Sequence, residues 1–241
     1  MFRSWKNKKK DPSNGVIVII DDTVSVMEMM FLASTLPGGK REWYDMALSH
    51  ALRAAKNHVR QDGTTFHVVI YNEVTGKVIK RQTHQGYGDD STWARGQAWA
   101  IYGFGYVAEA TGNTLLLKTA ERVASTFLQL LPRDNVPPWD FDAPKGIAYK
   151  DTSASAIAAA GLQRLAKLTT KPKYSIAATE ILKSLATGWT SKTASWSPKP
   201  PSILRNGTSN YPSGQYAQGL IYGDYYVLEG LLGLVARQPF G

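Results

Sequence analysis

The side chains best suited to chemistry lie in one stretch, from His84 to Trp99, which combines a histidine, carboxylates, amides, an arginine and two tryptophans. Aromatic faces stack on the C–H faces of sugar rings, and an arginine can grip a carboxylate through two parallel hydrogen bonds. The combination favours binding of an acidic sugar. A structural interpretation fits the stretch equally well, with Asp90 or Ser91 capping a helix and the tryptophans in the core.

A pair of adjacent carboxylates, Asp21 and Asp22, stands between the apolar run 16–20 and a predicted helix. An acid in that place can simply cap the helix and oppose its dipole, and this interpretation is strong for one of the two. Burial beside apolar residues also disfavours the charged form of a carboxyl group, which makes it a proton donor near neutral pH. The pattern alone leaves both roles open.

The four histidines and the absence of cysteine limit the possible chemistries. His67, in a predicted strand, is more typical of a structural residue, although the hairpin that carries it leads to His84. His50 and His58 are expected at the surface or at the edge of the core. Without a tight histidine pair or any thiolate, the sequence predicts no metal site and no cofactor.

Several other classes of function are poorly supported. The chain has no glycine-rich phosphate loop and no serine in a nucleophile elbow, which argues against phosphoryl transfer and serine hydrolysis. The formal charge of +9 is concentrated at the start of the chain, around Arg3 and 6–10, and is otherwise scattered. This distribution predicts a solvated basic tail rather than a nucleic-acid partner, and a mildly basic surface would also suit an anionic sugar.

No segment of the sequence has the length of a secretory signal or a membrane span. The apolar run 15–20 is too short for either, so no membrane association is expected. As written, the sequence predicts a cytoplasmic protein, with secretion open if a signal peptide precedes it.

The periodicity of apolar residues predicts a mostly helical chain that forms one domain over 1–241, with a basic start at 1–14 that could be disordered. A β-hairpin is expected around 65–83, and 16–20 reads as a strand or as the entry to the first helix. Successive helix pairs fit a toroid better than a four-helix bundle. The predicted helices lie near 23–35, 40–58, 92–111, 114–131, 152–169, 173–187 and 220–236.

Taken together, these motifs resemble the unsaturated glucuronyl, or unsaturated chondroitin disaccharide, hydrolases of glycoside hydrolase family 88. The matching segments are 19–22 with 31–34, 59–63, 84–99, 139–141, 151–154 and 223–226, and 83–103 is the most specific. The resemblance implies an all-α fold, the (α/α)6 barrel or six-hairpin toroid. It also implies release of a 4,5-unsaturated uronic acid from the non-reducing end of lyase-generated oligosaccharides, by protonation of C4 and addition of water at C5.

Site residues follow from the same resemblance. Counting back from 33–34 assigns the general acid to Asp22 rather than Asp21. The substrate-binding residues that correspond to the family's cleft are Trp5, His67, His84, Gln85, Trp93, Arg95 and Trp99. Family members carry well over a hundred further residues upstream, so we expect an incomplete barrel with little turnover by itself; the alternative is an inactive sugar-binding remnant. The preferred disaccharide, tolerance of sulfation and oligomeric state do not follow from the sequence.

Overall fold

The computed structural model describes residues 1–5, 15–147, 149–190 and 202–235, so most of the predicted basic start lies outside the described residues. The seven predicted helices are confirmed, with ends that agree to within two residues. They are α1 (Asp22–Thr35), α2 (Arg41–His58), α3 (Ala94–Thr111), α4 (Thr114–Leu130), α5 (Thr152–Thr169), α6 (Pro172–Gly188) and α7 (Ile221–Val235).

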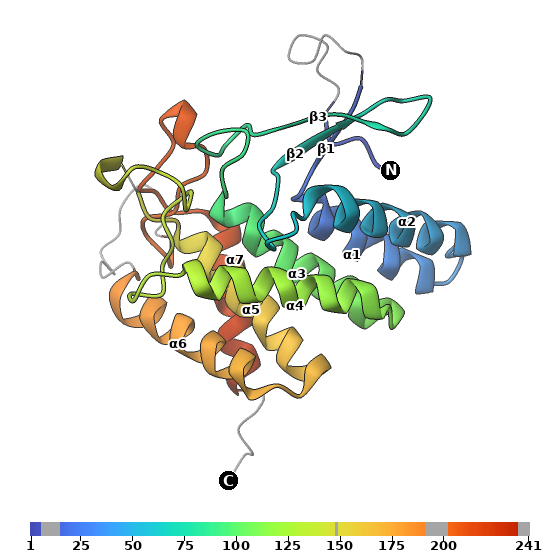
Figure 1. Cartoon of the computed structure of the whole chain (residues 1–241). Coiled ribbons are helices and arrows are strands. Elements are labelled where there is room, and N and C mark those ends of the chain that lie inside the picture. The colour runs from blue at the N-terminus through green and yellow to red at the C-terminus, as the bar shows by residue number, and fades with distance from the viewer. Residues whose placement is uncertain (6–14, 148, 191–201, 236–241) are drawn as a thin grey trace.

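The helices form two layers of successive hairpins (Figure 1). One layer runs α1–α3–α5–α7, each helix packed on the next, and the other layer consists of α2, α4 and α6, which pack against the outside of their partners. Small residues in α5 allow close contact with α3, while α4 keeps one face exposed to solvent. This arrangement is part of an α/α barrel, as the sequence predicted.

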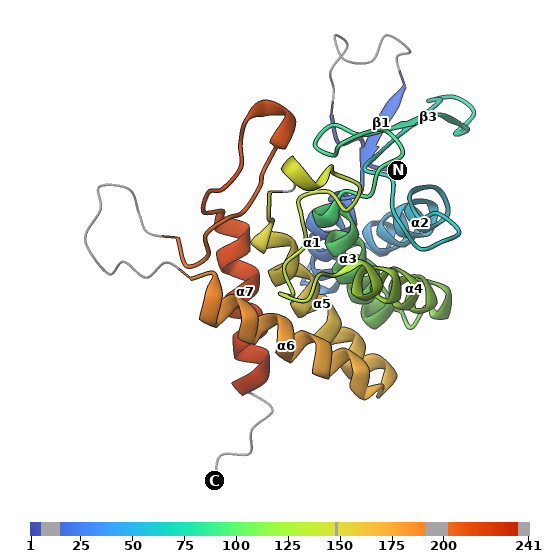
Figure 2. The ribbon, with the colours of Figure 1, turned by 60° about the vertical axis from the view of Figure 1, so that its left-hand side comes forward.

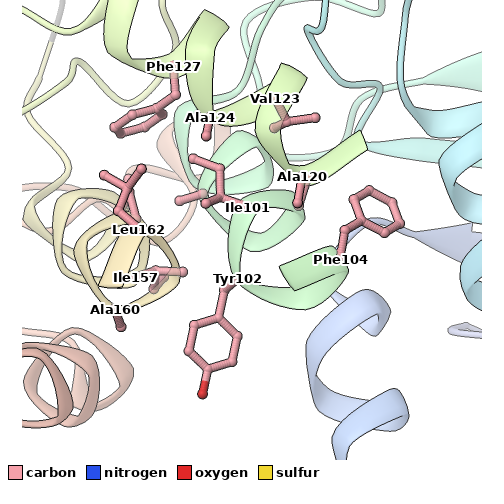
Figure 3. Close-up of a cluster of buried hydrophobic side chains, with 14 of the residues drawn as sticks. Ile101, Tyr102, Phe104, Ala120, Val123, Ala124, Phe127, Ile157, Ala160 and Leu162 are labelled. Atoms are coloured by element: carbon pink, nitrogen blue, oxygen red, sulfur yellow. The ribbon is translucent and has the colours of Figure 1, made fainter. Parts of the chain in front are cut away.

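The core lies between α3, α4 and α5, where apolar side chains from the three helices meet (Figure 3). Two glycines permit the closest approaches. A Cβ atom at Gly161 would lie 2.9 Å from the backbone of Tyr102, and one at Gly103 would lie 2.4 Å from the carbonyl oxygen of Thr23. The second contact matters for function, because it presses the first turn of α1 against α3 and fixes the residues just before it.

A small antiparallel sheet covers one end of the helices (Figure 1). Its strands are β1 (Val16–Ile19), β2 (Val68–Tyr71) and β3 (Val78–Gln82), in the order β1-β2-β3. The predicted hairpin is therefore confirmed, and the run from Val16 is a strand rather than a helix entry. Because β1 leads directly into α1 and β3 leads towards α3, the sheet brings the two candidate segments of the sequence to the same end of the fold.

Candidate active site

The turn between β1 and α1 sends the side chains of Asp21 and Asp22 into different surroundings. Ile20 still pairs with the sheet, because its N–H donates to the carbonyl oxygen of His67 at 2.9 Å. The chain then turns, and the hydroxyl of Thr23 donates to the carbonyl oxygen of Ile20 at 2.8 Å. Asp21 stands at the N-cap of α1 but forms no capping hydrogen bond with its side chain. Its carboxylate is therefore available for other contacts.

Asp21 faces the predicted binding residues. Its Oδ2 atom lies 3.7 Å from Nε2 of His67, and the side chain as a whole is 24% exposed. Oδ2 itself is buried and, among the described residues, has no hydrogen-bond partner of normal geometry. The indole N–H of Trp99 also has none, and it lies near enough to Asp21 to favour the ionised carboxylate. A buried carboxylate oxygen without a partner is costly, which identifies the place where a ligand group or water would be bound.

Burial raises the pKa of Asp21 to about 6. The positive charge of Arg95 opposes this shift, the nearby carboxylate of Asp22 adds to it, and the indole N–H of Trp99 favours the ionised form. A carboxyl group with a pKa near 6 holds its proton in a useful fraction of molecules at neutral pH and can still release it. Asp21 therefore has the proton affinity expected of a general acid.

His67 is a neutral imidazole whose orientation is set by the loop that follows β3. Its Nδ1 atom accepts from the backbone N–H groups of His84 and Gln85, at 3.2 and 3.3 Å. The proton must then be on Nε2, the nitrogen that points to Asp21. Burial and the charge of Arg95 lower the pKa of His67 well below its usual value, so it stays neutral. His67 is thus a fixed hydrogen-bond donor aimed at the carboxylate.

Asp22 lies in different surroundings from those that the sequence analysis expected for it, since Asp21 and not Asp22 faces His67. The Oδ2 atom of Asp22 accepts a short hydrogen bond from the hydroxyl of Ser4. That hydroxyl in turn accepts from the backbone N–H of Ile19 at 2.9 Å. Asp22 is 8% exposed, and burial raises its pKa while the Ser4 hydrogen bond lowers it. Its contacts hold the first residues of the chain against β1.

Arg95 is positioned differently from the prediction, which made it a grip for the carboxylate of a sugar. Its side chain is buried, and its two terminal nitrogens already donate four hydrogen bonds to the protein. The acceptors are Asp151 Oδ2 (2.7 Å), Thr208 O (2.5 Å), Gln85 Oε1 (2.5 Å) and Ser209 O (2.6 Å). Because these bonds use every N–H of both terminal groups, Arg95 cannot grip a ligand through two parallel hydrogen bonds. It joins α3 and α5 to the loop at 206–218.

Gln85 gains a defined orientation from this network. Since its side-chain oxygen accepts from Arg95, the amide NH2 is the group left for an oxygen atom of a ligand. Gln85 is half-buried.

The predicted aromatic residues lie around Asp21 and His67, although not all are accessible. Trp93 is 2% exposed and packs on His67 with ring centroids 4.2 Å apart, so it is a core residue rather than a sugar platform. Trp5 and Trp99 are half-buried. Trp5 packs on His84 at 5.0 Å, and Trp99 packs on Tyr226 at 5.4 Å. The accessible aromatic surface therefore comes from Trp5 and Trp99.

Asp140, in the matching segment 139–141, is a buried carboxylate with a structural role. Asp140 is fully buried, and its Oδ2 atom accepts from the N–H of Tyr87 at 2.9 Å and from the hydroxyl of Ser91 at 2.7 Å. Asp151 caps α5 and also pairs with Arg95. These two acids fix the loop before α3 and the helix beside it. Their long-range partners could not be seen in the local sequence.

Within the described residues, no cluster of three or more histidine, aspartate or glutamate side chains could hold a metal ion. In the same part of the chain, no helix has the length and apolar character needed to cross a membrane.

Comparison with known proteins decides the relationship. No family model matches the sequence. The unsaturated glucuronyl hydrolase of Formosa agariphila is 36% identical over 235 residues, which cover 95% of this chain and 57% of that protein. The unsaturated glucuronyl hydrolase of Bacillus sp. (strain GL1) is 34% identical over 241 residues, with 97% of this chain and 62% of that protein covered. The chain is a homologue of the unsaturated glucuronyl hydrolases.

Solved structures agree with this relationship. The unsaturated glucuronyl hydrolase of Bacillus sp. GL1, described as responsible for degradation of glycosaminoglycan, matches with a TM-score of 0.87 and 35% identity, over 96% of this chain and 62% of that one. A hydrolase specific for heparin matches with a TM-score of 0.89 and 31% identity, over 98% and 62%. The homologue described here thus spans about three fifths of the length of these relatives.

Proposed function

We propose that this chain takes part in glycoside hydrolysis, releasing a 4,5-unsaturated uronic acid from the non-reducing end of an oligosaccharide, and that Asp21 is the general acid. One observation carries the assignment. The buried Oδ2 atom of Asp21 has no partner among the described residues, and it faces the Nε2 atom of His67 at 3.7 Å. The homology supports the substrate class, because a solved relative is in complex with the oligosaccharide dGlcA-Glc-Rha-Glc.

The proposed reaction uses the double bond of the sugar. Protonated Asp21 donates its proton to C4, and a water molecule adds its oxygen at C5 while its proton passes to the carboxylate of Asp21. The product is a hemiketal, which opens, breaks the bond to the leaving sugar and releases a keto acid. No net proton is gained or lost by the protein, because Asp21 begins and ends the cycle protonated.

Neighbouring residues favour the charge that develops during this cycle. When Asp21 gives up its proton, the Nε2–H of His67 and the positive charge of Arg95 both stabilise the carboxylate that remains. These groups are held in place by the loop after β3 and by the four hydrogen bonds of Arg95, so no rearrangement is required. Trp5 and Trp99 supply the accessible aromatic surface for the sugar ring.

A pair of substrates tests the proposal. The first is an unsaturated disaccharide produced by a chondroitin lyase, and the second is the same disaccharide after reduction of its double bond. Because little turnover is expected from the chain by itself, the incubation is prolonged and the protein concentration is high. We expect slow loss of the ultraviolet absorbance of the double bond and release of the second sugar from the first substrate, with no cleavage of the reduced one. Cleavage of both would show displacement at the anomeric carbon instead and would contradict the proposed chemistry.

The second candidate function is sugar binding without hydrolysis, by a chain that keeps the cleft but not the full catalytic site. The occupation of both terminal nitrogens of Arg95 by the protein and the span of about three fifths of the relatives' length favour it. Titration calorimetry with the unsaturated disaccharide separates the two, because heat of binding without any product over prolonged incubation would support this second function and overturn the first.

A further inference from the structure

Two grooves run along the outer helix α2, one on each side of it. Figure 2 shows α2 between the hairpin that carries β3 and helix α4. The first groove, of about 720 Å³, lies between α2 and the turn at 76–78 of the hairpin. The second, of about 840 Å³, lies between α2 and α4. Lys56 lines both grooves, so they adjoin, and we refer to them together as the α2 surface, which is lined by residues within 45–61, 76–78 and 114–122.

The fold gathers cations from three distant parts of the chain at the α2 surface. They are Arg53 and Lys56 of α2, Lys77 of the hairpin, and Lys118 and Arg122 of α4. All five are exposed, and none forms an ion pair with another described residue. The one acid that lines either groove, Asp45, is paired with Arg41 at 3.0 Å. Charges that are scattered in the sequence thus create one positive field, which attracts an anionic ligand.

The uncharged lining of the α2 surface suits a sugar better than a nucleic acid. Ser49 and Asn57 in the first groove, and Gln61 and Thr114 in the second, offer hydroxyl and amide groups that hydrogen-bond with sugar hydroxyls. None of the described residues that line the grooves is aromatic, so the bases of a single-stranded nucleic acid would find no side chain to stack on. The surface therefore favours an acidic polysaccharide among polyanions.

A buried polar group without a normal hydrogen bond lies beside the first groove. Tyr71 of β2 is 2% exposed, and its hydroxyl has no partner of normal geometry among the described residues. Burial raises the pKa of Tyr71 to about 12, and Asn57 and Arg53, which line the groove, lie near enough to oppose this rise. The hydroxyl therefore keeps its proton at neutral pH. A buried donor without a partner indicates a place where an oxygen atom of a ligand or water would be bound.

We infer that the α2 surface binds the chain of an acidic polysaccharide, at a site separate from the cleft around Asp21. None of the residues that line this surface belongs to the candidate active site. Carboxylates or sulfates of the polysaccharide contact the five cations, and its hydroxyl groups contact Ser49, Asn57 and Gln61. The choice of a polysaccharide among polyanions rests in part on the proposed function, whereas the site itself rests on the charge and shape of the surface.

Binding of a polymer that cannot be a substrate provides the test. The probe is a fluorescently labelled fragment of chondroitin sulfate with saturated ends, which has no double bond for the proposed reaction. We expect the full chain to bind it at physiological salt, with an affinity that falls as the salt concentration rises, and not to bind dextran, a neutral polysaccharide. Absence of binding, or equal binding of dextran, would overturn the inference. Tighter binding of DNA with the same number of charges would overturn the choice of ligand.

Removal of charge locates the site. A triple variant with Lys56→Gln, Lys118→Gln and Arg122→Gln removes three of the five cations and leaves the fold's ion pairs in place. We expect it to bind the labelled fragment about tenfold more weakly, or less well still, because the attraction at this surface is mainly electrostatic. Circular dichroism checks that the variant remains helical. Unchanged binding by a folded triple variant would contradict the location.

A matched control removes the same charges elsewhere. It carries Arg133→Gln, Lys167→Gln and Lys173→Gln, which replace one arginine and two lysines that are exposed and outside both grooves. The control should bind the fragment within about twofold of the unsubstituted chain, since isolated surface charges contribute little. Equal weakening by both variants would show an effect of net charge alone and would overturn the inference.

The unsaturated disaccharide tests the proposed function separately. It is too short to occupy both the cleft and the α2 surface, so the triple variant should bind it as the unsubstituted chain does. Loss of disaccharide binding in the triple variant would place the cations in the cleft and overturn a separate site. Retained binding of the saturated fragment by a chain that neither binds nor hydrolyses the disaccharide would contradict the proposed function and support the site on α2.

Discussion

Asp21 and Asp22 are neighbours in the chain, yet their carboxylates belong to two regions with opposite characters. The region around Asp22 is satisfied, since its oxygen accepts from Ser4 and Ser4 accepts from the backbone of β1. The region around Asp21 is unsatisfied, since a buried oxygen faces His67 without a hydrogen bond. Burial raises the pKa of both groups, so burial alone does not distinguish a catalytic acid.

The difference between the two regions lies in what is left to bind. A carboxylate whose hydrogen-bond donor belongs to the protein, as Ser4 does for Asp22, stabilises the fold. A buried carboxylate without a hydrogen bond lowers the stability of the empty site, and a bound ligand can supply the missing partner. Active sites often carry such a stability cost. We therefore expect substitutions at Asp21 to affect activity, and substitutions around Asp22 to affect stability.

The largest expected effect follows from Asp21→Asn. The amide keeps the shape of the side chain but cannot donate a proton to C4, so kcat should fall by about 10³-fold or more. The assay follows loss of the ultraviolet absorbance of an unsaturated disaccharide. It compares each variant with the unsubstituted chain under conditions in which the unsubstituted chain hydrolyses this substrate. Asp22→Asn is the matched control and should keep kcat within a few-fold. A larger loss from Asp22→Asn than from Asp21→Asn would reverse our assignment.

A second substitution acts on the network that holds the Asp21 region. Arg95→Met removes the charge and all four hydrogen bonds but keeps much of the side-chain volume. It leaves the buried carboxylate of Asp151 without its cation, although Asp151 still accepts from Ser153 and Thr208. We expect the free energy of unfolding to fall by about 3 kcal/mol, because removing one partner of a buried ion pair is strongly destabilising. Urea denaturation followed by circular dichroism gives this number. A change below about 1 kcal/mol would show that the loop at 206–218 does not depend on Arg95.

The pH dependence of activity separates the two carboxylates in another way. An acid must be protonated to act, so kcat/KM should fall as the pH rises through about 6, the pKa to which burial raises Asp21. Asp22→Asn should leave this inflection within a few tenths of a pH unit, since Asp22 contributes only a minor part of the shift. An inflection that is lost in Asp22→Asn would mean that Asp22 carries the proton.

The sequence was sufficient to predict the positions of the helices, but it was insufficient to predict the burial and partners of several side chains. Apolar periodicity located all seven helices, because an amphipathic helix shows its buried face in its own sequence. It did not show that His50 and His58 are fully buried, against our expectation. His50 accepts from the N–H of Phe2, and His58 contacts the carbonyl oxygen of Phe66, so the partners lie outside the helix that carries both histidines.

The candidate site shows the same limit. The sequence grouped segments that lie together in the fold, because the sheet brings 16–22 and 84–99 to the same end. Counting residues selected Asp22 as the general acid, whereas the carboxylate that faces His67 is that of Asp21. Arg95 was assigned to a ligand because its acceptors, Thr208 and Ser209, lie more than a hundred positions away in the chain. Local patterns identify residue types suited to chemistry, whereas long-range hydrogen bonds decide which of them remain available.

The smallest expected effect concerns Ser4→Ala, which removes the hydrogen bond to Asp22 and leaves the contacts of Asp21 unchanged. At pH 7 the buried carboxylate of Asp22 loses its partner, and we expect a loss of about 1 kcal/mol in the free energy of unfolding. Burial already raises the pKa of Asp22 in the folded chain above its unfolded value, and removal of the Ser4 hydrogen bond raises it further. The folded state then binds the proton more tightly, so the loss should shrink as the pH falls towards the folded pKa.

The control for this pH dependence is Ser175→Ala, which removes a hydroxyl bonded only within α6. Its effect on the free energy of unfolding should not change with pH. A Ser4→Ala loss that is equal at pH 7 and pH 4.5 would mean that the hydroxyl stabilises β1 through Ile19 and not through the charge of Asp22.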